Sequence, residues 1–202
     1  MAIGTLTKQA RRAVKRVTLV WRQSLLDDTP PWLRRLAATP ASYFDMLFID
    51  HGIFRIVYSN RHALDVRAFR SAQPAPHHIR SLARQGIRTI VNLRGERLCG
   101  SYWLEQAACQ RHGIALVNYQ VRSRAAPSRE ELRGARALFE QIEYPMLMHC
   151  KSGSDRAGLM SVLYRHLKLG EPMEQAIKQL SLRYGHRQRQ LSLDSALLFG
   201  VE

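Results

Sequence analysis

A cysteine and an arginine six positions apart enclose a short glycine-containing segment in the C-terminal half of this 202-residue chain. A cysteine thiolate is a nucleophile, and a guanidinium group binds two oxygens of a phosphate through paired N–H donors. The spacing therefore indicates a loop that both binds phosphate and attacks it. The segment reads His149-Cys150-Lys151-Ser152-Gly153-Ser154-Asp155-Arg156.

The flanking residues predict how this loop is held. An apolar run at residues 145–148 has the length of a buried strand, and apolar residues recur with helical spacing after Arg156. The loop is therefore expected to join a strand to a helix N-terminus. Unpartnered backbone N–H groups and the helix dipole favour both a thiolate and a bound phosphate there. Gly153 supplies backbone freedom, and Lys151 adds positive charge at the mouth.

The eight residues resemble the His-Cys-x-x-Gly-x-x-Arg signature of the cysteine-dependent protein tyrosine and dual-specificity phosphatases. The resemblance implies that Cys150 attacks phosphorus, that Arg156 and residues 151–154 bind the phosphate, and that water hydrolyses the resulting phosphocysteine. It also implies that neither a metal nor a cofactor is needed. His149 is expected to orient the loop by hydrogen bonding, because it emerges on the other side of the strand. The alternative is an inert buried cysteine in an ordinary strand–helix turn.

The proton donor for the leaving group is harder to assign. Well-known family members carry an aspartate on a loop before the nucleophile strand, but residues 121–128 contain no carboxylate. Asp155 is the candidate, because the Gly-x-Asp-Arg ending resembles a bacterial branch of atypical tyrosine and lipid phosphatases with a loop acid. A bound phosphate would favour its protonated form. Asp155 could equally pair with a basic residue and shape the loop. Glu130 and Glu131 fit better as first-turn helix acids.

Two upstream segments extend the resemblance. Residues 69–74 are similar to a Tyr-Arg-Ser-Gly-Gln-Pro element of bacterial and fungal atypical dual-specificity phosphatases, with alanine for glycine, and residues 91–96 are similar to an Asn-Leu-Arg segment. Arg70 and Arg94 are therefore supporting candidates. Each either approaches the phosphate loop or fixes neighbouring loops by pairing with internal carboxylates or carbonyls.

Alternating patterns predict an α/β domain at residues 51–202, with a central, mostly parallel sheet flanked by helices and a cysteine phosphatase-like fold. The signature loop falls at the carboxyl end of a strand, where such sheets bind ligands. Residues 1–50 are predicted to form an N-terminal helical extension. The predicted strands are residues 53–59, 65–70, 87–93, 114–121 and 145–149, and the predicted helices are residues 75–85, 102–112, 128–142, 157–169 and 172–183.

Charge points to anionic partners. The net charge is +15, which attracts anions without selecting among them. Residues 6–26 form a basic amphipathic pattern, typical of a helix that lies on an anionic membrane or packs on its own domain. The extension carries no apolar run long enough to span a bilayer and no secretory signal pattern. Three cysteines suit a reducing compartment, so we expect a cytoplasmic protein with peripheral contact at the inner membrane.

The substrate class stays open between two chemistries. Phosphorylated protein comes first, and an anionic phospholipid or glycolipid, such as a phosphoinositide or a lipid A-like molecule, comes second because of the basic helix. Nucleic acid is disfavoured, because no nucleic-acid-binding motif is evident. A phosphate-binding adaptor without catalysis is the non-enzymatic alternative.

Overall fold

The computed structural model describes residues 40, 42–49, 58–97, 99–122 and 128–186. The chain divides into two compact units, residues 1–53 with 98–104 and residues 54–97 with 105–202. The amphipathic pattern at residues 6–26 lies outside the described residues. The boundary expected near residue 50 stays a prediction.

The larger unit contains a five-stranded sheet in the order β1-β2-β5-β3-β4. The edge strand β1 runs antiparallel to β2, and the other three pairings are parallel. The predicted α/β fold with a mostly parallel sheet is therefore confirmed. The strand that leads into the signature is the central one. The strands are β1 (His62–Ala63), β2 (Ala68–Ala72), β3 (Thr89–Asn92), β4 (Ala115–Asn118) and β5 (Met146–Cys150).

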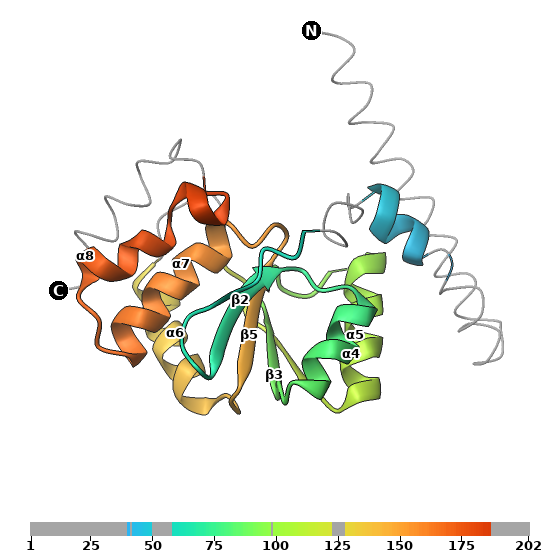
Figure 1. Ribbon diagram of the computed structural model, residues 1–202, viewed down its shortest axis with the longest axis horizontal. Coiled ribbons are helices and arrows are strands. Elements are labelled where there is room, and N and C mark those ends of the chain that lie inside the picture. Colours follow the sequence, from blue (N-terminus) through green and yellow to red (C-terminus); the bar gives the residue numbers. More distant parts are fainter. Residues whose placement is uncertain (1–39, 41, 50–57, 98, 123–127, 187–202) are drawn as a thin grey trace, which may run out of the picture. The chain divides into compact units, whose positions relative to one another are not determined.

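Helices cover both faces of this sheet (Figure 1). Strand β5 alternates: Met146, Met148 and Cys150 join one core with the helices α6 and α7, and Leu147 joins the other core with α4 and residues 105–112 of α5. This period of two places successive β5 side chains on opposite faces. The helices are α4 (Pro76–Arg84), α5 (Gly100–His112), α6 (Arg129–Gln141), α7 (Asp155–Leu163) and α8 (Met173–Ala176).

Three predicted strands differ clearly from the structure. The strand predicted at residues 114–121 ends at Asn118. Strand β2 begins at Ala68 and not at Asp65, because the Asp65 carboxylate accepts hydrogen bonds from the Arg67 and Ala68 N–H groups and forms a turn. Most of the strand predicted at residues 53–59 lies outside the described residues. Its last two residues are not in a strand, and β1 follows them instead.

The helix predicted at residues 172–183 is wrong as a continuous element. It is divided into α8 and two 3₁₀ turns, η3 (Ile177–Gln179) and η4 (Leu182–Tyr184). The chain leaves helical geometry at Leu180, where φ is −97° and ψ is 74°. The helix predicted at residues 157–169 begins earlier, at Asp155, and continues from α7 into the π-helix η2 (Tyr164–Lys168). The last two residues of the signature, Asp155 and Arg156, are therefore the first two residues of α7.

The smaller unit contains the π-helix η1 (Asp45–Ile49) and the first residues of α5. The Asp45 carboxylate accepts a hydrogen bond from the N–H of Gly100, and a Cβ at Gly100 would collide with the backbone of Ser42. Close backbone contact therefore requires glycine at this position. None of the helices in the described ranges has both the length and the apolar character that a bilayer crossing needs.

Candidate active site

Cys150 is the last residue of β5, paired in parallel register with Ala72 at the end of β2. Its side chain is 3% exposed, and α7 begins five residues later. Gly153 turns the connecting loop with φ +77°, and a Cβ there would lie 2.7 Å from the Ala72 nitrogen. Both the left-handed backbone and the close approach to β2 require glycine. The sequence thus places a cysteine on a tightly shaped turn at a helix N-terminus.

The carbonyl groups of residues 151–154 in this loop accept hydrogen bonds from other parts of the fold. Within the described part of the chain, the N–H groups of residues 152–154 have no acceptor in the fold. A loop whose carbonyls are occupied and whose N–H groups are free is a cradle for an anion. The donors are the Gln73 N–H to the Lys151 carbonyl at 3.4 Å, Asn60 Nδ2 to the Ser152 carbonyl at 3.0 Å, and Arg70 Nη2 to the carbonyls of Gly153 and Ser154 at 2.7 and 3.0 Å.

Arg70 is fully buried at the centre of this support. Its Nη1 donates to the backbone and side-chain oxygens of Gln179 at 2.7 and 3.0 Å, and its guanidinium lies 4.3 Å from the centre of the Tyr184 ring. Burial lowers the pKa of Arg70 to about 10, which still leaves it charged at neutral pH. Of the two roles open to Arg70, its contacts are those of a loop-fixing residue.

Arg156 lies half-buried in the first turn of α7. Burial lowers its pKa, the charge of Cys150 raises it, and the nearby cations Arg94 and Arg97 lower it. Arg94 is 5% exposed and donates to the side-chain oxygen of Gln73, and Arg97 Nε donates to the Arg94 carbonyl at 3.3 Å. Arg156 therefore lies near Cys150 and two further guanidinium groups, whose positive charge an anionic ligand would neutralise.

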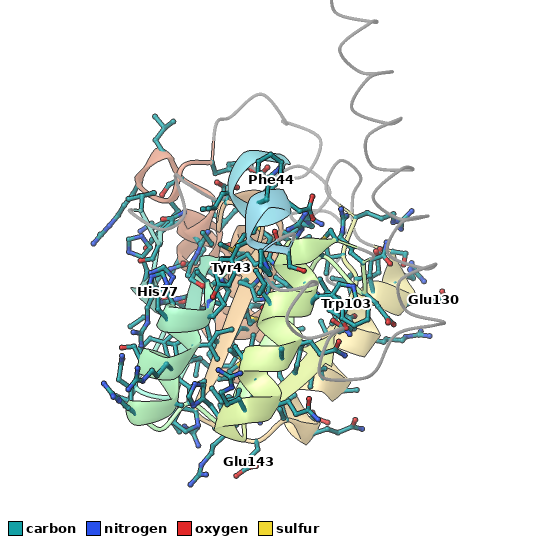
Figure 2. All side chains as sticks on the ribbon, turned by 90° about the vertical axis from the view of Figure 1, so that its right-hand side faces the viewer. Tyr43, Phe44, His77, Trp103, Glu130 and Glu143 are labelled. Carbon is teal, nitrogen blue, oxygen red and sulfur yellow. The ribbon has the colours of Figure 1, made fainter. Side chains whose placement is uncertain are left out.

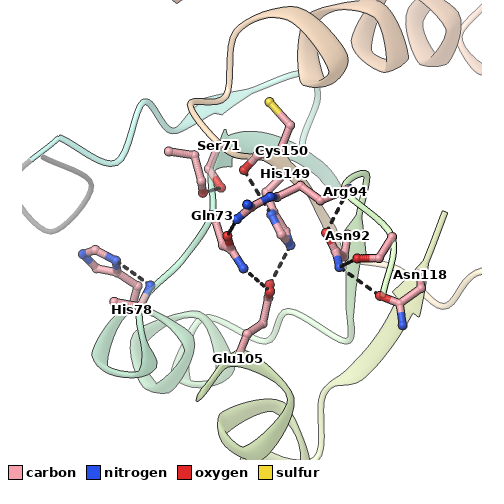
Figure 3. Close-up of polar contacts among 12 residues, drawn as sticks. Ser71, Gln73, His78, Asn92, Arg94, Glu105, Asn118, His149 and Cys150 are labelled. Atoms are coloured by element: carbon pink, nitrogen blue, oxygen red, sulfur yellow. Dashed lines mark hydrogen bonds and ion pairs between the residues drawn. The ribbon is translucent and has the colours of Figure 1, made fainter. Parts of the chain in front are cut away.

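A buried polar network lies behind the cysteine (Figure 3). His149 Nε2 is 2.6 Å from Glu105 Oε1, and both side chains are fully buried. The other oxygen of Glu105 accepts from Gln73 at 2.8 Å, and His149 Nδ1 lies 3.3 Å from the Cys150 carbonyl. His149 and Cys150 point to opposite sides of β5, so the imidazole faces Glu105 and not the thiol. Its contacts suit a residue that orients the loop.

Asp155 is the first residue of α7, and its side chain is 47% exposed. Its Oδ1 is 2.9 Å from Nδ1 of His186, whose side chain is 1% exposed. Asp155 therefore does pair with a basic residue, as one of its two expected roles required. Its carboxyl is also open to solvent. The remaining polar loop residues are Lys151, which is half-buried, and Ser152 and Ser154, whose hydroxyl oxygens lie 3.1 Å apart.

The alternative acids have a structural task. Ser128 caps α6, and Glu131 returns a hydrogen bond by accepting from the Ser128 N–H at 2.6 Å. The hydrogen bond from Arg122 lowers the pKa of Glu131 to about 2, against opposing burial. Glu131 is thus held ionised, which does not suit a proton donor at neutral pH. Glu130 is exposed on the first turn of α6 (Figure 2).

Four residues at the site were not found by sequence reasoning. Asn60, Gln179 and His186 carry no local signal, because their partners are far away in the chain: Asn60 and His186 contact residues 152 and 155, and Gln179 contacts Arg70. Glu105 does carry one: an acidic residue four positions before Cys109, on the buried side of a helix, requires a buried partner.

The family model described as DSP-PTPase phosphatase fused to NAD+ kinase matches residues 55–195. This chain belongs to that family. The predicted membership of the protein tyrosine and dual-specificity phosphatases is thereby confirmed, and the family match includes the loop, both flanking networks and His186.

Individual proteins similar to this chain are also phosphatases by their descriptions. The dual specificity protein phosphatase TpbA of Pseudomonas aeruginosa is 28% identical over 121 residues, 60% of this chain and 53% of its own length. The chain thus spans about half the length of the curated relatives it matches. The TpbA crystal structure superposes with a TM-score of 0.58 at 23% identity, covering 71% of this chain and 86% of that one. The structure of a putative phosphatase from Neisseria meningitidis superposes with a TM-score of 0.51 at 25% identity, covering 66% of this chain and 96% of that one.

Proposed function

We propose that this chain hydrolyses phosphomonoesters of phosphorylated protein through a phosphocysteine intermediate. The supporting observation is the loop itself. The carbonyls of residues 151–154 are occupied from behind, the free N–H groups lie beside Cys150, and Arg156 follows at the helix N-terminus. Such a site binds a phosphate and presents a thiolate to it.

The proposed chemistry uses four groups of this chain. The Cys150 thiolate attacks phosphorus, an S–P bond forms, and the bond to the leaving oxygen breaks as Asp155 gives that oxygen a proton. Water then attacks phosphorus, the S–P bond breaks, and the Asp155 carboxylate takes the proton of the water. Arg156 and the loop N–H groups, with Lys151 nearby, stabilise the charge that spreads over the phosphoryl oxygens.

The test is turnover of an aryl phosphate and of a phosphotyrosine peptide. We expect turnover that vanadate inhibits and that Cys150→Ser abolishes, whereas Cys109→Ala, which changes a buried core cysteine of α5, retains it. Phosphotyrosine is the first probe because a cysteine-to-serine variant of TpbA has been crystallised in complex with phosphotyrosine. A folded protein that binds the peptide without releasing phosphate would be an adaptor, contrary to this proposal.

We also propose that the protein is cytoplasmic and that residues 6–26 contact the inner membrane, which would bring an anionic lipid within reach. Support comes from the net charge of +15 and from the exposed aromatic side chains Tyr43, Phe44 and Trp103 in the smaller unit (Figure 2). Aromatic rings and basic residues together favour a lipid interface.

Vesicle binding by the full chain tests the membrane contact. Charge reversal at Arg11, Arg12, Lys15 and Arg16 should abolish sedimentation with anionic vesicles. Reversal at Arg80 and Arg84, which are exposed on α4, serves as the control. Equal binding by both variants would contradict the proposed contact. Phosphate release from phosphoinositide vesicles and from the phosphopeptide, measured side by side, separates the two substrate classes.

A further inference from the structure

His186 is a buried imidazole at the site for which the proposed chemistry has no task. It follows the 3₁₀ turn η4 and contacts Asp155, 31 positions away in the sequence, at 2.9 Å. The two side chains differ sharply in exposure, 1% for His186 and 47% for Asp155. The carboxyl group is thus open to solvent on one side and held from the protein interior on the other.

The two ring nitrogens of His186 have different surroundings. Within the described residues, its Nε2 is buried and has no hydrogen-bond partner. A protonated imidazole would bury a second N–H without an acceptor, whereas a neutral ring with its proton on Nδ1 leaves only a lone pair unpaired. With the ring proton on Nδ1, His186 donates to Asp155 Oδ1 and leaves only a lone pair at the buried Nε2. Among the described residues, Asp155 Oδ2 accepts no hydrogen bond, so this oxygen is available to carry a proton.

The turn that carries His186 is built against the phosphate loop. Asn60 Nδ2 donates to the carbonyls of both Ser152 and Tyr184, at 3.0 Å each. Gly185 has φ +77°, and a Cβ there would lie 3.2 Å from the Ser154 hydroxyl. The His186 N–H donates to the Ser181 carbonyl at 3.2 Å. These contacts fix the position of the imidazole relative to the loop. The contact between His186 and Asp155 is therefore held by the surrounding fold.

We propose that His186 is a positioning residue that orients Asp155 for proton transfer. This inference rests on the proposed function, in which Asp155 is the acid. His186 holds Oδ1, so the proton sits on Oδ2. When the O–H bond at Oδ2 breaks and the proton passes to the leaving oxygen, the Nδ1–H group stabilises the carboxylate that remains.

Other charged and titratable groups surround this pair. Arg70 of β2 and Arg156 of α7 both attract the Asp155 carboxylate, and the Cys150 thiolate and Tyr184 also act on Arg70. A bound phosphate dianion opposes the two guanidinium groups. The pH profile of turnover therefore depends on all of these groups together. The decisive measurement is how strongly kcat/KM depends on the leaving group of the substrate.

The experiment compares phenyl phosphate, whose leaving group needs a proton, with dinitrophenyl phosphate, whose leaving group does not. His186→Leu should lower kcat/KM for phenyl phosphate by about 10- to 100-fold and change dinitrophenyl phosphate by less than about threefold. His186→Asn places an amide donor near the Nδ1 position and should restore most of the loss. Adding His186→Leu to Asp155→Asn should cost little more, because both remove the same step.

His166→Leu is the matched control. Its Nδ1 also contacts an oxygen, the Glu171 carbonyl at 2.9 Å, but it lies in η2 at the far end of α7. Thermal denaturation of each variant reports folding. Equal losses on both substrates, or no loss on phenyl phosphate where Asp155→Asn shows one, would overturn the positioning role. If Asp155→Asn leaves both substrates unchanged, the acid and its positioning residue are both wrong. Absence of turnover by the unmodified protein would instead refute the proposed function.

Discussion

Two carboxylate–histidine pairs flank the phosphate loop, and solvent reaches only one of them. Glu105 and His149, behind β5, are both fully buried at 2.6 Å, whereas Asp155, at the start of α7, is 47% exposed above a buried His186 at 2.9 Å. A buried pair fixes geometry, because breaking it strands a charge or a donor in the interior. A pair with one exposed carboxyl can exchange a proton with a ligand. The same chemical pairing is thus fully buried on one side of the loop, whereas on the other side it leaves a carboxyl exposed, which is the arrangement that the proposed acid needs.

The largest effect on stability should come from Glu105→Ala. It leaves His149 and Gln73 buried without their acceptor, and we expect the free energy of unfolding to fall by about 3–5 kcal/mol. Urea denaturation measures this loss. Glu105→Gln keeps an oxygen and the side-chain volume and should cost clearly less. A loss below about 1 kcal/mol for Glu105→Ala would place this pair in the same class as an exposed one.

Gly153→Ala tests the loop that connects the two pairs. The new Cβ would lie 2.7 Å from the Ala72 nitrogen with φ at +77°, so we expect a loss of roughly 1–3 kcal/mol together with most of the turnover. Gly170→Ala is a matched control, because φ there is +70° and no atom lies within 4 Å of the added Cβ. If both variants lose equal stability and activity, backbone strain alone explains the result and the close approach to β2 does not matter.

Asp155→Ala should separate activity from stability. Because the substitution removes the acceptor of one buried donor, the Nδ1–H of His186, where Glu105→Ala strands two side chains, we expect the free energy of unfolding to fall by about 1–3 kcal/mol, less than for Glu105→Ala. Turnover of phenyl phosphate should nevertheless fall by about 100-fold. Parallel denaturation and kinetic measurements give both values. A stability loss as large as that of Glu105→Ala would erase the distinction between the pairs.

Glu131→Gln should give the smallest effect and a specific pH dependence. The pKa of Glu131 is about 2 in the folded protein and 4.5 without its partners. The contribution of the ionised Glu131 side chain to the free energy of unfolding is therefore complete above about pH 4.5 and disappears as the pH falls toward 2. At neutral pH the variant should lower Tm by at most about 3 °C. A difference in Tm that persists at pH 2 would exclude the Arg122 and Ser128 contacts as its cause.

What the sequence could predict depends on how far apart the contacting residues lie. The apolar run before Cys150 and the signature define the β5–loop–α7 unit locally, so both the fold class and the anion cradle follow from the pattern. The hydrogen bonds that hold the carbonyls of the cradle cannot be predicted from this pattern. Arg70 reaches the loop over 83 positions and Asn60 over 92, and no periodic pattern encodes such contacts.

The failure at residues 172–183 has the same origin. Helical spacing predicts a continuous helix, but the Gln179 carbonyl accepts from Arg70 and the chain turns at Leu180. A tertiary hydrogen bond to a buried cation therefore overrides local propensity. This departure carries the chain toward η4 and His186. The segment that sequence reasoning predicted least well is the one that completes the candidate site.

The double contact of Asn60 has a consequence for synthesis of the protein. Its side chain joins Ser152 to Tyr184, contacts that span 92 and 124 positions. Contacts this distant in sequence close late during folding. A growing polypeptide on the ribosome therefore contains Cys150 and Arg156 well before the cradle around them can close. The loop after Cys150 therefore stays without the Asn60 contact that ties it to Tyr184 until residue 184 has emerged.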